Sequence, residues 1–317
     1  MPENPESAQT NSLRHIIAIV GPTASGKSAL GIEVALRIGG EIINCDSVQV
    51  YQQIEIATAK VPIDERRGVP HHLIDLISPD QTFTAADWAR AAIQTIDETE
   101  SRGNVPVLVG GTGFYLRALR QPFFPSPATD EELRHRLTRI RERYGLERLH
   151  RILLKFDTAE AEKLHPRDWP RVQRAIEFYL QTGERISAHR PLRPAPPQLA
   201  ARLRIFALNP PRNALYARIN ERTDSHFANG LVDEVRRLLE AAVPPNSSAL
   251  GAHGYRRVVE HLHGQRTLES AIEQTKLDVR HYAKRQLTWF RREAGVEWIE
   301  GFGDDPQVQA KVLALLS

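Results

Sequence analysis

The sequence has a single cysteine, Cys45, among 317 residues. One cysteine excludes an internal disulfide and a zinc site built from several cysteines, and it is typical of a reducing compartment. No apolar run approaches the ~18 residues of a membrane-spanning helix. The N-terminal residues MPENPESAQTNS lack the basic and apolar regions of a signal peptide. We therefore expect a cytoplasmic protein without a membrane segment, and a disordered tail over residues 1–13.

Extremes of composition are also missing. Apolar residues make up 41% and charged residues 26% of the chain, which excludes a fibrous or disordered protein. Charge is unevenly distributed along the chain. Residues 1–120 carry 10 Lys and Arg against 14 Asp and Glu, whereas residues 121–200 carry 15 against 11 and residues 201–317 carry 17 against 14. Most of the excess positive charge is arginine, which suits phosphate contacts and base stacking, although solvated helix faces would look the same.

Short apolar strands alternate with helical patterns in most of the chain. The expected strands are HIIAIV (15–20), EIINC (41–45), HLIDLI (72–77), VPVLVG (105–110) and RLRIFAL (202–208). The expected helices include 27–38, 85–99, 213–226, 231–242 and 268–290. This alternation predicts an α/β fold in which a parallel sheet of the P-loop NTPase type carries helices on both faces.

The strand signals vanish between about residues 121 and 198, where Pro-rich segments bracket an Arg-rich helical sequence. This pattern predicts an inserted all-helical subdomain over 123–198. The catalytic core is then assembled from 14–122 and 199–317.

Residues 21–28, GPTASGKS, match the P-loop pattern directly after a strand and at the start of a helix. Backbone N–H groups of such a loop and the positive end of the helix stabilise a diphosphate. Lys27 should reach phosphate oxygens, and the Ser28 hydroxyl is the expected ligand of Mg²⁺.

A P-loop indicates a polyphosphate without identifying it. A kinase or NTPase also needs a carboxylate after an apolar strand to hold Mg²⁺, yet the strand at 105–110 runs into GGTG. Asp46 and Asp75 are the remaining strand-end acids. Asp46 is expected beside the P-loop, although it could also cap a turn or helix. The residues leave open a small-molecule kinase and an RNA-binding P-loop NTPase.

Several further motifs share their order and spacing with one family. They are DSVQVY (46–51), IATAK (56–60), HHLID (71–75), VGGTGFYLRAL (109–119), RVQRAIEFYLQTG (171–183), RINER (218–222) with GLVDEV (230–235), and KRQLTWFRR (284–292). Together with GPTASGKS, they resemble tRNA dimethylallyltransferase over nearly the whole chain. The resemblance implies transfer of a dimethylallyl group from dimethylallyl diphosphate to the N6 amine of the adenosine 3′-adjacent to the anticodon. It also implies a P-loop that binds the donor without phosphoryl transfer, so that any ATP-binding label comes from the motif alone.

The resemblance assigns roles to individual residues. Asp46 would accept the proton of the attacking amine, with Thr23 and Arg218 as further catalytic residues. Arg218 is preferred over Arg222, one helical turn later, as the contact of the leaving diphosphate, although either could form a local salt bridge. The predicted donor site comprises Gly21, Pro22, Thr23, Ala24, Ser25, Gly26, Lys27, Ser28, Arg218 and Arg222.

The tRNA anticodon stem-loop is the other implied partner, and the acceptor base must be flipped out of its stack. Arg171 and Arg174 lie three residues apart and should share a helix face toward the RNA, unless that face is only solvated. The predicted RNA contacts are Asp46, Ser47, Val48, Gln49, Thr112, Arg134, Pro170, Arg171, Val172, Gln173 and Arg174. We expect a monomer.

Three positions depart from the usual family pattern. Ser28 replaces the commoner threonine and is equivalent for Mg²⁺. His253 stands where an apolar residue is usual and is expected to serve local packing. Pro170 suits the first turn of a helix.

Overall fold

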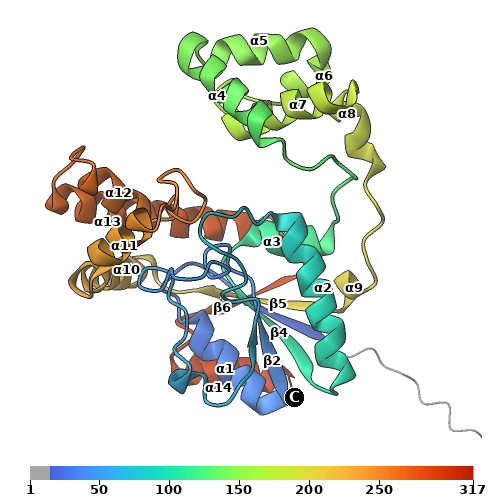
Figure 1. Ribbon diagram of the computed structural model, residues 1–317. Helices are drawn as coiled ribbons and strands as arrows, with labels where there is room; N and C mark the ends of the chain where they lie inside the picture. Colours follow the sequence, from blue (N-terminus) through green and yellow to red (C-terminus); the bar gives the residue numbers. More distant parts are fainter. Residues whose placement is uncertain (1–14, 317) are drawn as a thin grey trace, which may run out of the picture. The chain divides into compact units, whose positions relative to one another are not determined.

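The computed structural model describes residues 15–316. Six strands form one parallel sheet in the order β3-β2-β4-β1-β5-β6 (Figure 1). The strands are β1 Ile16–Val20, β2 Gly40–Asn44, β3 His71–His72, β4 Val105–Gly110, β5 Leu203–Asn209 and β6 Val296–Glu300. Every residue of β1 and β2 is buried, as expected for parallel strands that are covered on both faces.

Two strand predictions need correction. The segment 72–77 contributes only its first residue to a strand, because Leu73 and Asp75 adopt left-handed backbone conformations with φ of 60° and 55°. Its later N–H groups donate to the loop after β2 instead, for example from Leu76 to the Val50 carbonyl oxygen at 2.8 Å. Strand β6 was not predicted. It lies at the sheet edge, where most of its residues are only half-buried, so its sequence lacks a continuous apolar run.

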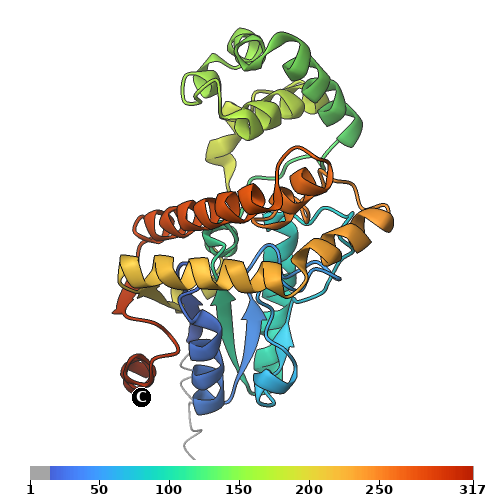
Figure 2. The same ribbon diagram turned by 90° about the vertical axis from the view of Figure 1, so that its left-hand side faces the viewer.

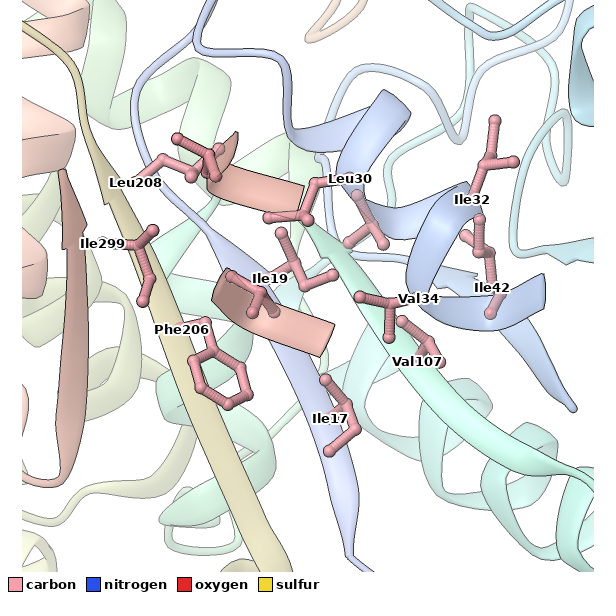
Figure 3. Packing of buried hydrophobic residues seen from close by; sticks show 14 of the residues in the cluster. Ile17, Ile19, Leu30, Ile32, Val34, Ile42, Val107, Phe206, Leu208 and Ile299 are labelled. Atoms are coloured by element: carbon pink, nitrogen blue, oxygen red, sulfur yellow. The ribbon is translucent and has the colours of Figure 1, made fainter. Parts of the chain in front are cut away.

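Helices cover both faces of the sheet (Figure 1). Helices α1 (Lys27–Ile38) and α14 (Pro306–Leu316) pack on one face, and α2 (Ala85–Ser101) and α3 (Gly113–Arg120) pack on the other. Figure 3 shows the core on the first face, where Leu30 and Val34 of α1 meet Ile19, Val107 and Phe206 of the sheet. This packing fixes the start of α1 above the end of β1.

Four more helices lie beyond the carboxyl edge of the strands: α10 Arg212–Ala228, α11 Leu231–Glu240, α12 Tyr255–Leu262 and α13 Leu268–Phe290. Helices α10 and α13 run side by side (Figure 2). Buried residues of α11 and α12 pack on Val50, Tyr51 and Ile54, which belong to the loop after β2. The short elements η1 (Asp64–Arg66) and α9 (Leu199–Arg202) complete this part of the chain.

The chain divides into two compact units, and residues 121–197 form the second. Its elements are α4 Glu131–Tyr144, α5 Leu146–Phe156, α6 Thr158–Ala161, α7 Trp169–Thr182, α8 Ile186–His189 and η2 Arg190–Leu192. Leu149, Leu153, Val172 and Phe178 form the centre of its own hydrophobic core. The described part of this unit is helical, as the sequence predicts for 123–198. The predicted tail 1–13 lies outside the described residues.

Across residues 15–316, no helix combines the length and the apolar character needed to cross a membrane.

Candidate functional site

The loops that follow β1, β4 and β2 meet at one edge of the sheet, because these strands are parallel neighbours in the order β2-β4-β1. They border a cavity of about 940 Å³ in the first unit. Its wall includes residues 23–28 of the P-loop, Asp46–Gln49 and Thr112, and it also includes side chains from α10 and α13. Most of the predicted donor site and the Asp46 segment therefore share one cavity.

The P-loop ends at the first residue of α1 in a geometry open to an anion. Gly26 caps the helix with a left-handed backbone (φ 81°), and no side chain caps the first turn, which also lacks acidic residues. A side chain at Gly26 would collide with Asp304, since a Cβ there would lie 2.5 Å from the Asp304 Oδ1. The Ser25 hydroxyl is buried without a hydrogen-bond partner among the described residues. Unpaired donors at a helix N-terminus favour phosphate oxygens.

Lys27 is half-buried in the cavity wall, and its ammonium donates to the Pro22 carbonyl oxygen at 2.6 Å. Burial lowers the pKa of Lys27 to about 8, although attraction to Asp46 opposes the shift; repulsion by Arg222 adds to it. Two cations and one carboxylate therefore act on each other within this cavity. A diphosphate would relieve the repulsion between Lys27 and Arg222.

Asp46 follows β2 and stabilises the turn in which it lies. Its Oδ1 accepts a hydrogen bond from the Val48 N–H at 2.9 Å, and its own N–H donates to Asn44 Oδ1 at 3.0 Å. The turn-capping alternative is thus observed, but it occupies one carboxylate oxygen only. Oδ2 has no hydrogen-bond partner among residues 15–316 and remains available for proton transfer.

Thr112 holds the Asp46 segment against the GGTG loop. The Ser47 N–H donates to Thr112 Oγ1 at 3.0 Å, and the Thr112 N–H donates to the Cys45 carbonyl oxygen at 3.1 Å. The neighbouring glycines allow this approach, because a Cβ at Gly110 would lie 2.1 Å from the Cys45 oxygen. Thr112 therefore has a clear structural role, and its contact with RNA stays a prediction.

The structure favours Arg222 over the predicted Arg218 as the diphosphate contact. Both belong to α10, but Arg222 lines the cavity, whereas Arg218 is not part of its wall. The Arg218 guanidinium forms a bidentate ion pair with Asp304 at 2.8 and 2.9 Å and stacks on the Phe302 ring. Burial lowers the pKa of Arg222, and attraction to Asp46 opposes this shift. Arg222 is therefore the better candidate for a diphosphate.

Ser47, Val48 and Gln49 all line the cavity. The Gln49 amide nitrogen already donates to the carbonyl oxygens of Thr58 and Ala59, at 2.9 and 3.2 Å. Its side chain is therefore held by the protein rather than extended toward solvent.

The predicted RNA contacts of the insertion form a less uniform set. Arg134 of α4 and Arg174 of α7 both pair with Glu177, whose side chain is fully buried, at 3.3 and 2.9 Å. Arg171 is largely exposed and pairs with Asp168 at 3.2 Å. Val172 is a correction: it is buried in the core of the unit, so its side chain does not face a partner.

Pro170 and Gln173 lie on α7 near these arginines. Pro170 is exposed in the first turn of the helix, as predicted, and Gln173 is half-buried. The two arginines of the predicted RNA-facing side therefore differ: Arg171 is exposed, whereas Arg174 is paired with the buried Glu177.

Sequence reasoning gave no role to Gln286, although it lies in the KRQLTWF motif. Gln286 is buried, its Oε1 accepts from the Thr23 N–H at 2.8 Å, and its Nε2 donates to the Gly111 carbonyl oxygen at 2.9 Å. It therefore links the P-loop to the GGTG loop. Its place inside the KRQLTWF motif was the only signal of this role.

His226 and Tyr282 also line the cavity and were not singled out. His226 Nε2 accepts from the Arg222 guanidinium at 3.3 Å, and burial together with Arg222 lowers the pKa of His226 to about 4. Burial raises the pKa of Tyr282, which is hydrogen-bonded to Thr112. His253 packs on the Tyr282 ring at 4.8 Å, which agrees with its expected packing role.

Comparison with known proteins identifies the family. Residues 49–293 match the family model described as IPP transferase. The chain is 45% identical to a tRNA dimethylallyltransferase of Solibacter usitatus, over 93% of this chain and 95% of that protein. It is 44% identical to a tRNA dimethylallyltransferase of Geobacter metallireducens, over 94% and 96% of the two chains. The chain belongs to the IPP transferase family.

Solved structures agree with this membership. A full-length tRNA isopentenylpyrophosphate transferase of Bacillus halodurans has 38% identity and a TM-score of 0.70, with 96% of this chain and 95% of that chain covered. A eukaryotic dimethylallyltransferase described as acting on tRNA has 28% identity and a TM-score of 0.76, over 90% and 74% of the two chains. This member of the IPP transferase family is therefore a transferase with a P-loop-type fold, and the kinase and NTPase alternatives lose their support.

Proposed function

We propose that this protein transfers a dimethylallyl group from dimethylallyl diphosphate to the N6 amine of the adenosine 3′-adjacent to the anticodon in tRNA. One observation carries the proposal. A single cavity joins a P-loop to the Asp46–Gln49 segment, and β4 ends in glycines rather than in the acid that a phosphoryl-transfer enzyme needs. Relatives that share most of the chain are tRNA dimethylallyltransferases.

The donor diphosphate is expected at the start of α1. The N–H groups of the P-loop and the helix dipole stabilise its charge, and Lys27 and Arg222 lie in the wall of the same cavity. Charge on the diphosphate grows as the carbon–oxygen bond breaks, so these fixed cations stabilise the transition state more than the ground state.

The transfer forms one bond and breaks one. The N6 lone pair attacks C1 of the allylic group, the bond from C1 to the bridging oxygen breaks, and diphosphate leaves with the electron pair. The amine becomes acidic as the new bond forms, and Asp46 Oδ2 accepts the released proton. Thr23, at the mouth of the P-loop, contributes its hydroxyl to the donor site.

Apolar side chains line the same cavity and suit a five-carbon chain. They include Val109, Ile219, Phe227 and Val279. Such a lining excludes water from the allylic carbon, which protects the donor from hydrolysis and strengthens the electrostatic contacts.

The donor set fits a Mg²⁺ ion that is held mainly by diphosphate and water. Among residues 15–316, no cluster of three or more His, Cys, Asp or Glu side chains could hold a metal. The Ser28 hydroxyl lines the cavity beside Lys27 and supplies the one hard oxygen that such an ion requires from the P-loop. When bound, Mg²⁺ neutralises part of the diphosphate charge.

RNA binding, assembly and location complete the proposal. The arginines of the helical insertion are proposed to bind the anticodon stem-loop, and the protein is proposed to act as a cytoplasmic monomer. The anticodon loop must present an unstacked adenine to the cavity.

The decisive experiment incubates the purified protein with labelled dimethylallyl diphosphate and unmodified tRNA. Nucleoside mass spectrometry should find the label on the adenosine next to the anticodon. ATP should be neither consumed nor required. Consumption of ATP without prenylated nucleoside would overturn the proposal in favour of the kinase alternative.

A further inference from the structure

Glu234 of α11 is a buried carboxylate that has no part in the proposed reaction. It is only 5% exposed, and carboxylates are rarely buried unless they are paired. It accepts hydrogen bonds from the backbone N–H groups of Glu55 at 3.2 Å and Ile56 at 3.3 Å. The IATAK segment, of which residues 57–60 line the cavity, is therefore bound through its backbone.

Tyr255 of α12 completes this arrangement. Its hydroxyl donates to Glu234 Oε1 at 2.6 Å and accepts from the Ala57 N–H at 3.2 Å. Three consecutive amides, at residues 55, 56 and 57, thus converge on one buried carboxylate and its phenol partner. Consecutive N–H groups that converge in this way form an anion-binding nest. In this protein the group bound by these N–H groups is the side chain of Glu234 rather than a ligand.

The opposite end of the segment holds Gln49. The side-chain amide lies between two carbonyl oxygens, those of Thr58 and Ala59, and only its nitrogen can donate to both. Ala59 has a left-handed backbone (φ 55°), and the Thr58 hydroxyl donates to the carbonyl oxygens of Ile54 and Glu55 at 3.1 and 2.9 Å. The amide orientation is thereby fixed, and Gln49 Oε1 is left as an acceptor in the cavity wall.

We propose that Glu234 and Tyr255 are positioning residues that fix the 55–59 segment and so present Gln49 to the substrate as a hydrogen-bond acceptor. This inference rests on the proposed function and refines the same site. An acceptor at this position selects a nucleobase that offers an N–H donor, and it discriminates against a base that presents a carbonyl oxygen there. Glu234 and Tyr255 act through Gln49 and touch no reacting atom.

A double-mutant cycle tests this inference. Tyr255→Phe removes one hydroxyl from a buried network, and Gln49→Met removes the acceptor while keeping the side-chain length. Removing a buried hydrogen bond from a positioned loop should lower kcat/KM for the anticodon stem-loop by about tenfold, with KM for dimethylallyl diphosphate unchanged. In the Gln49→Met background, Tyr255→Phe should cost less than about twofold, because the affected group is already gone.

Thr99→Val is the matched control. Thr99 is a buried residue of α2 whose hydroxyl donates to Glu41 at 3.5 Å, and neither residue is part of the cavity wall. It should leave kcat/KM and the coupling unchanged. Amide hydrogen exchange at residues 55–57 should accelerate in Tyr255→Phe and not in Thr99→Val. Should Tyr255→Phe fail to fold, Glu234→Gln enters the same cycle with the same expected coupling.

The outcomes separate the inference from the proposed function. Wild-type protein that prenylates no RNA would refute the proposed function before the cycle begins. Active wild-type protein in which Tyr255→Phe lowers kcat/KM by the same factor with and without Gln49 would refute the positioning role alone. An unchanged kcat/KM in Tyr255→Phe would do the same.

Discussion

The proposed function gives the two carboxylate oxygens of Asp46 different tasks, and a substitution can separate them. Oδ1 accepts from the Val48 N–H, whereas Oδ2 is assigned to the proton of the attacking amine. Asp46→Asn keeps an oxygen for the turn and removes the base. We predict that kcat falls by about 10² or more in Asp46→Asn, with RNA affinity nearly unchanged. Single-turnover kinetics and a stem-loop binding titration measure the two quantities.

Asp46→Ala serves as the comparison, since it removes the turn contact as well. It should show a similar loss of kcat together with weaker RNA binding. Wild-type turnover in Asp46→Asn would show that another group accepts the proton.

Lys27 should make donor binding sensitive to pH. Burial lowers the pKa of Lys27 to about 8, so in the ligand-free protein the ammonium is charged below this pH and neutral above it. The bound diphosphate favours the charged form, and affinity must therefore fall as pH rises through about 8. We predict ~10-fold weaker binding of dimethylallyl diphosphate at pH 9 than at pH 7, measured by calorimetry without RNA.

Lys27→Arg is the control for titration of the ligand itself. Arginine stays charged over this range, so the variant should lose the alkaline weakening whatever its absolute affinity. Parallel pH profiles of wild type and Lys27→Arg would contradict the role assigned to Lys27. Lys27→Ala should damage donor use at all pH values and leave tRNA binding mostly intact.

At the scale of the element, helix α10 offers a matched pair of arginines one turn apart. Arg222 lines the cavity, and Arg218 pairs with Asp304 in a half-exposed position. We predict that Arg222→Ala lowers kcat/KM for the donor by about 10² or more, because a cation facing the leaving group is removed. Arg218→Ala should change it by less than about fivefold, since exposed ion pairs contribute little. Steady-state kinetics at varied donor concentration measure both losses. A larger loss in Arg218→Ala than in Arg222→Ala would identify Arg218 as the diphosphate contact.

Elements with a strong local pattern could be predicted, and those defined by tertiary contacts could not. The strand at 105–110 and the helices 27–38 and 268–290 have the predicted bounds, because apolar runs and helical periodicity specify them locally. The segment 72–77 looks like a strand, but its N–H groups pair with the loop after β2. Strand β6 is defined by its pairing with β5 at an exposed edge, which leaves little trace in the sequence.

The candidate site divides in the same way. The P-loop and Asp46 could be placed because motif and strand end together fix their position at the sheet edge. The choice between Arg218 and Arg222 depended on Asp304, a residue 86 positions away that pairs with one of them. Gln286 and Glu234 act through contacts with loops distant in sequence. Spacing alone does not reveal such partners.

At the scale of the whole molecule, the two units differ in net charge. Residues 1–120 and 201–317 together carry 27 basic against 28 acidic residues and supply the cavity, whereas residues 121–200 carry 15 against 11. Phosphate contacts by the second unit would then provide RNA affinity without altering donor binding. Variants of the insertion and variants of the cavity should therefore affect different measurements.

Arg171 and Arg174 on α7 test this separation. Replacing both with Ala should weaken binding of the anticodon stem-loop and flatten the dependence of log Kd on log salt by about one unit for each phosphate that the protein no longer neutralises. Donor binding should survive. The unit itself should stay folded, because Glu177 keeps Arg134 at 3.3 Å and the Asp130 N–H at 3.0 Å after Arg174 is removed. Titrations of the stem-loop at several salt concentrations measure the slope.

The matched control replaces Arg136 and Arg139, two exposed arginines three residues apart on α4, with Ala. This pair changes the charge of the unit by the same amount at a different place. If the α7 face binds phosphates directly, the Arg171 and Arg174 double variant should flatten the slope and the α4 pair should leave it nearly unchanged, since an arginine that contacts no phosphate releases no counterion on binding. Equal flattening by both pairs would mean that the unit attracts RNA only through its net charge. An unchanged slope with the α7 pair would mean that this face is solvated surface.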